Sequence, residues 1–207
     1  MAFLFLLIVS FYELMAIYLV ESQELNKKIH ELISDSDFMG YNIWVFNIFN
    51  YQLSKIPLIL WINRFINNVN YRKINLSLLG IFIFAAQVLT LTKIQEISGF
   101  QPLNYLMSYI LGIVACGLFF VDLISSEKSL EIHPLRFIPF WFITLTLFQQ
   151  VIVFLAEMSN DYLAFNEITL YYFFNYISMT LYVLMLTAIV VLIINQGLFI
   201  EKKAKTA

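Results

Sequence analysis

The stretch that decides the fold is ITLYYFFNYISMTLYVLMLTAIVVLIINQGLFI, residues 168–200, which contains no charged residue. An α-helix rises about 1.5 Å per residue, so about 20 apolar residues cross the roughly 30 Å hydrocarbon core of a bilayer. This run is longer than one crossing needs. We therefore expect a membrane-spanning helix that tilts, projects from the membrane or stops early, with residues 195–197 as the candidate stop.

Comparable apolar segments recur along the rest of the chain. Hydrophobic residues make up 61% of the sequence and charged residues 13%, against about 25% charged in soluble domains. The sequence therefore predicts an all-α integral membrane bundle of about six transmembrane helices in a single domain. The expected spans are residues 2–20, 41–62, 74–92, 103–122, 137–156 and 168–194.

Two of these spans need separate comment. Residues 2–20 lack the basic start and the small-residue cleavage site of a secretory signal, so we expect them to remain as the first transmembrane helix. The span at residues 41–62 is the least regular, because it carries several polar residues and Pro57 predicts a kink.

The connection at residues 21–40 has apolar residues at helical spacing, and Glu24 and Lys28 are placed to pair one turn apart. It predicts one short interfacial helix in an outer connection. Its apolar residues either rest on the bundle or headgroups, or form a lid over a cavity. Those residues are Leu25, Ile29, Leu32 and Ile33.

The basic residues of the connections predict the orientation. With both termini in the cytoplasm, eight Lys and Arg residues fall on the inner side and three on the outer side, as the positive-inside rule favours. Residues 195–207 would then form a cytoplasmic tail. The inner residues are Arg64, Arg72, Lys73, Lys128, Arg136, Lys202, Lys203 and Lys205, and the outer ones are Lys27, Lys28 and Lys93.

Polar side chains at similar depths suggest a layer near the membrane midplane. Glu13 is the strongest single indicator, because a short carboxylate side chain deep in a span cannot reach the headgroups. We expect Glu13 and Lys55 to approach one another, directly or through an intervening amide. The candidate ligand-binding or ion-pathway residues are Glu13, Asn47, Asn50, Ser54, Lys55, Gln87, Gln149, Gln150 and Tyr182.

Helical spacing groups several polar residues on single helix faces. One stripe follows residues 47, 50, 51 and 54, and another follows residues 171, 175, 178 and 182. Two interpretations remain open. The stripes either join helices through hydrogen bonds or line a polar cavity for a ligand or ion.

Several chemistries find no support in the sequence. His30 and His133 lie in connections, so neither a haem between spans nor a metal site is expected, and we predict no cofactor. No zinc-protease, phosphate-loop or nucleophile-elbow motif occurs, so we do not expect an enzyme. The net charge of −2 offers no basic surface for nucleic acid. Asp122 and Glu157 fall at span ends, where a structural role is expected.

These features predict a non-enzymatic multi-pass membrane module that senses or binds a small or lipid-like ligand or anchors a membrane partner. The alternative is a small transporter or channel subunit with a midplane polar site. The expected partners are membrane lipids, with another membrane protein or a second copy of the chain as further candidates. A bacterial inner membrane or an organelle membrane is the expected location.

Overall fold

The computed structural model describes residues 1–34, 37–38, 40, 43–125 and 137–205, with backbone alone at 160, 161, 164 and 195–205. All regular structure in these residues is helical. Lys128, Arg136 and His133 lie outside the described residues. The all-helical architecture expected from the sequence is confirmed.

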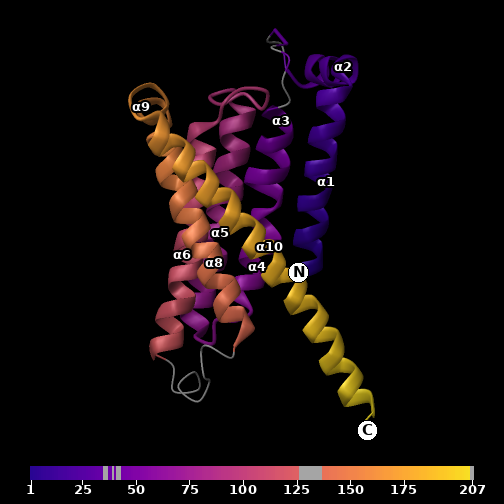
Figure 1. Ribbon diagram of the computed structural model, residues 1–207, viewed down its shortest axis with the longest axis vertical. Helices are drawn as coiled ribbons and strands as arrows, with labels where there is room; N and C mark the ends of the chain where they lie inside the picture. The colour runs from indigo at the N-terminus through magenta and orange to yellow at the C-terminus, as the bar shows by residue number, and fades with distance from the viewer. Residues whose placement is uncertain (35–36, 39, 41–42, 126–136, 206–207) are drawn as a thin grey trace.

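Within the described ranges, five helices are long and apolar enough to cross a membrane (Figure 1). Their lengths follow from uninterrupted apolar sequence, which in a bilayer is stable only when every backbone hydrogen bond is made within the segment. The helices are α1 (Ala2–Glu21), α5 (Val69–Leu91), α6 (Pro102–Ser125), α8 (Ile138–Met158) and α10 (Ile168–Lys205).

The expected span at 41–62 is not one α-helix. It consists of α3 (Ile43–Val45), the π-helix η1 (Phe46–Leu53) and α4 (Lys55–Asn63). Ser54 N–H donates to the Phe49 carbonyl at 2.9 Å, which is the wider turn of a π-helix. Pro57 lies in the first turn of α4, where its missing N–H is tolerated. The irregularity therefore precedes the proline instead of occurring at it.

The connection after α1 contains the helix α2 (Gln23–Ile33). Trp44 Nε1 of α3 donates to Asn26 Oδ1 at 3.1 Å, which fixes α2 against the start of the irregular segment. Directly after α2, the hydroxyl of Ser34 lies 2.8 Å from the hydroxyl of Ser98, which belongs to the connection between α5 and α6. These two contacts hold the α1–α3 connection at one end of the bundle.

The helix α10 follows the short helix α9 (Asn160–Asn166) and runs obliquely across α8 to the N-terminal half of α1 (Figure 1). It continues without a break through residues 195–197, so the expected stop there does not occur. The excess length is accommodated by tilt and by projection beyond the other helices, two of the three outcomes expected from its length.

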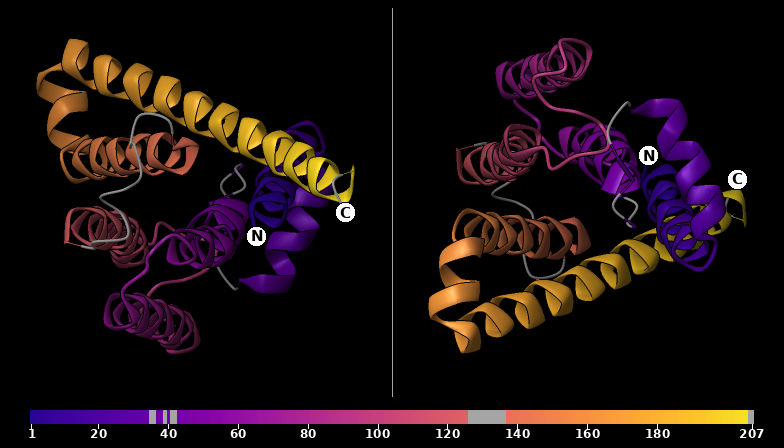
Figure 2. Two further views of the ribbon diagram at one scale, coloured as in Figure 1. Left: turned by 90° about the horizontal axis from the view of Figure 1, so that it is seen from below. Right: turned by 90° about the horizontal axis from the view of Figure 1, so that it is seen from above.

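Helices α10, α8 and α6 lie in a row, with α4 and α1 beside them and α5 outside, packed against α6 and α4 (Figure 2). Trp61 of α4 stacks on Phe142 of α8 with ring centroids 4.4 Å apart. Seven of the predicted polar residues lie between α1 and α4 on one side and α8 and α10 on the other.

The corner between α4 and α5 is held by a buried carboxylate. The two oxygens of Asp122 accept hydrogen bonds from Asn67 N at 2.6 Å and Asn68 N at 2.9 Å. Asn68 in turn caps α5 through its side-chain oxygen. Asp122 therefore has the structural role expected from its place at the end of a span.

Candidate functional site

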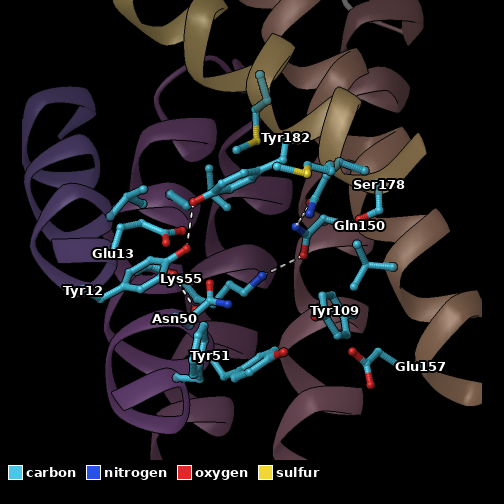
Figure 3. A pocket seen from close by; sticks show the side chains of 18 of the residues that line it. Tyr12, Glu13, Asn50, Tyr51, Lys55, Tyr109, Gln150, Glu157, Ser178 and Tyr182 are labelled. Atoms are coloured by element: carbon cyan, nitrogen blue, oxygen red, sulfur yellow. Dashed lines mark hydrogen bonds between the residues drawn. The ribbon is translucent and has the colours of Figure 1, made fainter. Parts of the chain in front are cut away.

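A cavity of about 430 Å³ lies between α1, η1 and α4 on one side and α8 and α10 on the other (Figure 3). One residue of α6, Tyr109, also lines it. Its walls combine apolar side chains with polar ones. The polar lining residues are Tyr12, Glu13, Asn50, Tyr51, Ser54, Lys55, Tyr109, Gln149, Gln150, Glu157, Asn175, Ser178 and Tyr182.

Lys55 is the central charged residue of the site, and its side chain is buried with 5% exposed. Its Nζ donates to Oε1 of Gln150 at 2.8 Å and lies 5.0 Å from the centroid of the Tyr109 ring. Gln150 Nε2 donates in turn to Oε1 of Gln149. The ammonium therefore heads a short chain of amide groups that runs along α8.

Among the described residues, no carboxylate lies within 4.0 Å of the Lys55 ammonium. Among the described side chains, the ion pair closer than 4.0 Å is the exposed pair Lys27–Glu31. The direct pairing of Glu13 with Lys55 that the sequence predicts does not occur. Lys55 does reach a glutamine of α8, as the indirect form of that prediction requires, but the hydrogen bonds of the described residues include none from Glu13 to Gln149 or Gln150.

Glu13 lies at the rim of the same cavity, on an exposed position of α1. Beside it, the hydroxyl groups of Tyr12 and Tyr182 lie 2.8 Å apart and join α1 to α10. Glu13 and Lys55 thus point into one cavity from α1 and α4 without meeting (Figure 3).

The π-helix places Asn50 and Tyr51 on the cavity wall. Tyr51 stacks on Tyr105 with centroids 3.9 Å apart and meets Tyr109 edge to face at 5.9 Å. Ser54 Oγ donates to the Asn50 carbonyl at 2.5 Å, so its hydroxyl is satisfied within the segment. A π-helix within a span often marks a functional site, because it re-aims side chains that an α-helix would place elsewhere.

The structure brings seven of the nine predicted residues to this cavity. Asn47 is fully buried elsewhere, and its Nδ2 donates to the carbonyls of Ile97 at 2.7 Å and Gly99 at 2.8 Å. Gln87 lies on an exposed face of α5. The seven are Glu13, Asn50, Ser54, Lys55, Gln149, Gln150 and Tyr182.

Six polar lining residues were not among the candidates. Three of them, Tyr51, Asn175 and Ser178, belong to the two polar stripes, and the other three are Tyr12, Tyr109 and Glu157. Tyr12 and Tyr109 carry no distinctive signal, because aromatic residues are common throughout these spans. Glu157 lies near the end of α8, where the sequence favours contact with headgroups, yet it borders the cavity.

Within the described part of the chain, none of the residues that line the cavity belongs to α2. Within the part of the chain that the structure describes, no group of three or more His, Cys, Asp or Glu side chains is placed to hold a metal ion. Comparisons with protein-family models, with curated proteins and with solved structures found no match to this chain.

Proposed function

We propose that the protein is a non-enzymatic, multi-pass membrane module that binds a small or lipid-like ligand in the cavity between α1 and α10. One observation carries the proposal. Lys55 is buried on the cavity wall, and among the described residues no carboxylate lies within 4.0 Å of its ammonium.

The energetics support this interpretation. Removing a charged group from water costs on the order of several kcal/mol, and one amide acceptor with one aromatic face offsets only part of that cost. Replacing a buried charged group by an apolar residue of similar volume is often neutral or stabilising. A ligand that supplies a hydrogen-bond acceptor to Lys55 would offset the rest of this cost, which the packing of the protein does not.

Access to the cavity runs between α1 and α10. Glu13, Asn175 and Met179 line the cavity and are also exposed on the surface of the protein. The surrounding surface of α10 is apolar and aromatic, as suits contact with lipid chains. A lipid-like molecule could therefore enter from the bilayer without crossing the bundle.

The topology that fits this proposal has six crossings and cytoplasmic termini. The segment formed by α3, η1 and α4 would add one crossing to the five long helices, as the second crossing in chain order. The start of α1 and the end of α10 lie toward the same end of the bundle (Figure 1). The helix α2 would then lie at the outer membrane interface.

Ligand co-purification tests the proposed function. The wild-type protein and the Lys55→Met variant would be extracted in mild detergent, and bound small molecules would be identified by native mass spectrometry. We expect a ligand in the wild type that is lost from Lys55→Met. The control is Lys73→Met, an exposed lysine of α5, which should retain it. An empty wild-type cavity, or equal retention by Lys55→Met, would contradict the proposal.

A small transporter is the second candidate, favoured by the Tyr12–Tyr182 contact. This single hydrogen bond joins helices from opposite ends of the chain beside the cavity, so its opening could change access to the site. Substrate flux into liposomes separates the two functions. A binding module should retain ligand without flux, whereas a transporter should release it on the opposite side.

A further inference from the structure

We infer that the ligand is a zwitterion whose acidic group binds Lys55 and whose ammonium group binds Glu13. This inference rests on the proposed function, because it requires that the cavity is a ligand site. It begins from a separation of charge: Lys55 and Glu13 face the same cavity and do not pair with each other.

The anion end of the ligand is set by Lys55. An ammonium group has three N–H donors, and the hydrogen bond to Gln150 Oε1 at 2.8 Å uses one of them. The ring of Tyr109 faces the same charge at 5.0 Å. A phosphate or carboxylate oxygen would receive charge-assisted hydrogen bonds from the remaining donors.

The cation end is set by Glu13 and its aromatic neighbours. Glu13 is an acceptor at the cavity rim, and the paired phenol groups of Tyr12 and Tyr182 lie beside it (Figure 3). An ammonium group would combine a charge-assisted hydrogen bond to the carboxylate with attraction to the aromatic faces. The second carboxylate, Glu157, lies beyond Tyr109 in the same view.

Ligands of a single charge fit this arrangement less well. A simple anion would satisfy Lys55 but would place a second negative charge near Glu13. A simple cation would satisfy Glu13 but would leave the buried Lys55 without a counter-ion. A zwitterion offers the opposite charge to both residues. In the direct Glu13–Lys55 pair expected from the sequence, the two residues would instead have neutralised each other.

The cavity volume suits a headgroup better than a whole lipid. At about 430 Å³ it falls within the usual range of roughly 300–1,000 Å³ for small-molecule sites. The shared chemistry is therefore an acidic group close to an ammonium group. The source is either the headgroup of a zwitterionic lipid, with its chains in the bilayer, or a free soluble zwitterion.

The test is equilibrium binding by calorimetry in detergent, with probes of defined charge. We expect short-chain phosphatidylethanolamine to bind at least tenfold more tightly than short-chain phosphatidylglycerol. Its N-acetylated form, which keeps the phosphate but lacks the ammonium charge, should lose at least tenfold. This comparison uses the wild-type protein, so it does not depend on how any variant folds. Free phosphoethanolamine distinguishes the sources: affinity equal to that of the lipid indicates a soluble zwitterion.

The variants assign the two ends. Lys55→Met should weaken both lipids, whereas Glu13→Gln should weaken phosphatidylethanolamine at least tenfold and leave phosphatidylglycerol no weaker. Glu24→Gln, an exposed carboxylate of α2, is the control and should change neither. Equal binding of both lipids, or a loss caused by Glu157→Gln and not by Glu13→Gln, would overturn the inference while leaving the proposed function intact. Binding of no probe and no co-purified ligand would instead reject the proposed function.

Discussion

A Cβ atom on Gly112 of α6 would lie 2.8 Å from Oε1 of Gln150 of α8, the oxygen that accepts the hydrogen bond from Lys55. The Gln150 side chain therefore occupies space that only a glycine at position 112 leaves free. This close approach of α6 and α8 fixes the amide that orients the buried ammonium. The absence of a side chain at Gly112 thus determines where the Gln150 amide lies beside Lys55.

Replacing Gly112 with alanine should displace Gln150. Because the clash also involves Gln150 Cγ at 3.1 Å and Cδ at 3.2 Å, we expect a destabilisation of about 1–3 kcal/mol and weaker ligand binding. Thermal unfolding in detergent and ligand retention would measure the two effects. Gly117→Ala on the same helix is the control, since nothing lies within 4 Å of its added Cβ. An equal effect at both glycines would contradict the role of Gly112.

The Tyr12–Tyr182 hydrogen bond should be detectable as a coupling between α1 and α10. Tyr12→Phe and Tyr182→Phe each remove one partner of the 2.8 Å contact, so each should destabilise the protein by about 0.5–1.5 kcal/mol. The double variant should cost no more than either single one, because the bond is already lost. Fully additive effects in this thermal-unfolding cycle would show that the two hydroxyl groups do not interact.

Asp122 should contribute to stability through its two backbone contacts. Asp122→Asn leaves one acceptor oxygen for two N–H groups, those of Asn67 and Asn68. We expect a loss of about 1–3 kcal/mol in the free energy of unfolding, without loss of ligand, because Asp122 does not line the cavity. The exposed Ser125→Ala serves as the control. Unchanged stability in Asp122→Asn would show that the corner is held by other contacts.

The sequence grouped cavity residues together where their expected depth in the membrane and their helical spacing indicated the same site. Lys55, Gln150 and Tyr182 could be grouped because apolar spans of known length fix the depth of each residue to within about a turn. Asn47 and Gln87 have similar sequence signals but lie elsewhere, since depth does not specify the direction of a side chain around its helix. Neighbouring helices decide that direction, and one sequence does not show them.

The irregular segment explains the other differences. A π-helix widens the turn and changes the directions of its side chains, and Asn47, near its start, departs from the face predicted for the stripe. Asn50 and Tyr51 lie within this segment and reach the cavity, whereas Asn47 turns toward the carbonyls of Ile97 and Gly99. The sequence indicated an interruption through Pro57 but not its position.

The buried contacts of Asn47 can be tested in the same way. Its Nδ2 donates to two loop carbonyls while its Oδ1 accepts from Tyr105 at 2.7 Å. Asn47→Asp keeps the acceptor but removes both donors, so we expect a destabilisation of about 1–3 kcal/mol in thermal unfolding. Gln87→Glu, on an exposed face of α5, is the matched control. A smaller effect at Asn47 than at Gln87 would contradict the anchoring role.

The proposed six-crossing topology predicts which described residues share a side of the membrane. In a Cys116→Ala background, single cysteines would be placed at Leu32 on α2 and at Ser125 at the end of α6, both exposed. Because an odd number of crossings separates these positions, an impermeant thiol reagent should label Leu32→Cys from outside intact cells and Ser125→Cys only after permeabilisation. A third cysteine at the exposed Asn70, near the start of α5, should behave like Ser125→Cys. If α3, η1 and α4 instead failed to cross, Leu32→Cys and Asn70→Cys would react from the same side, and the chain would have five crossings with its termini on opposite sides.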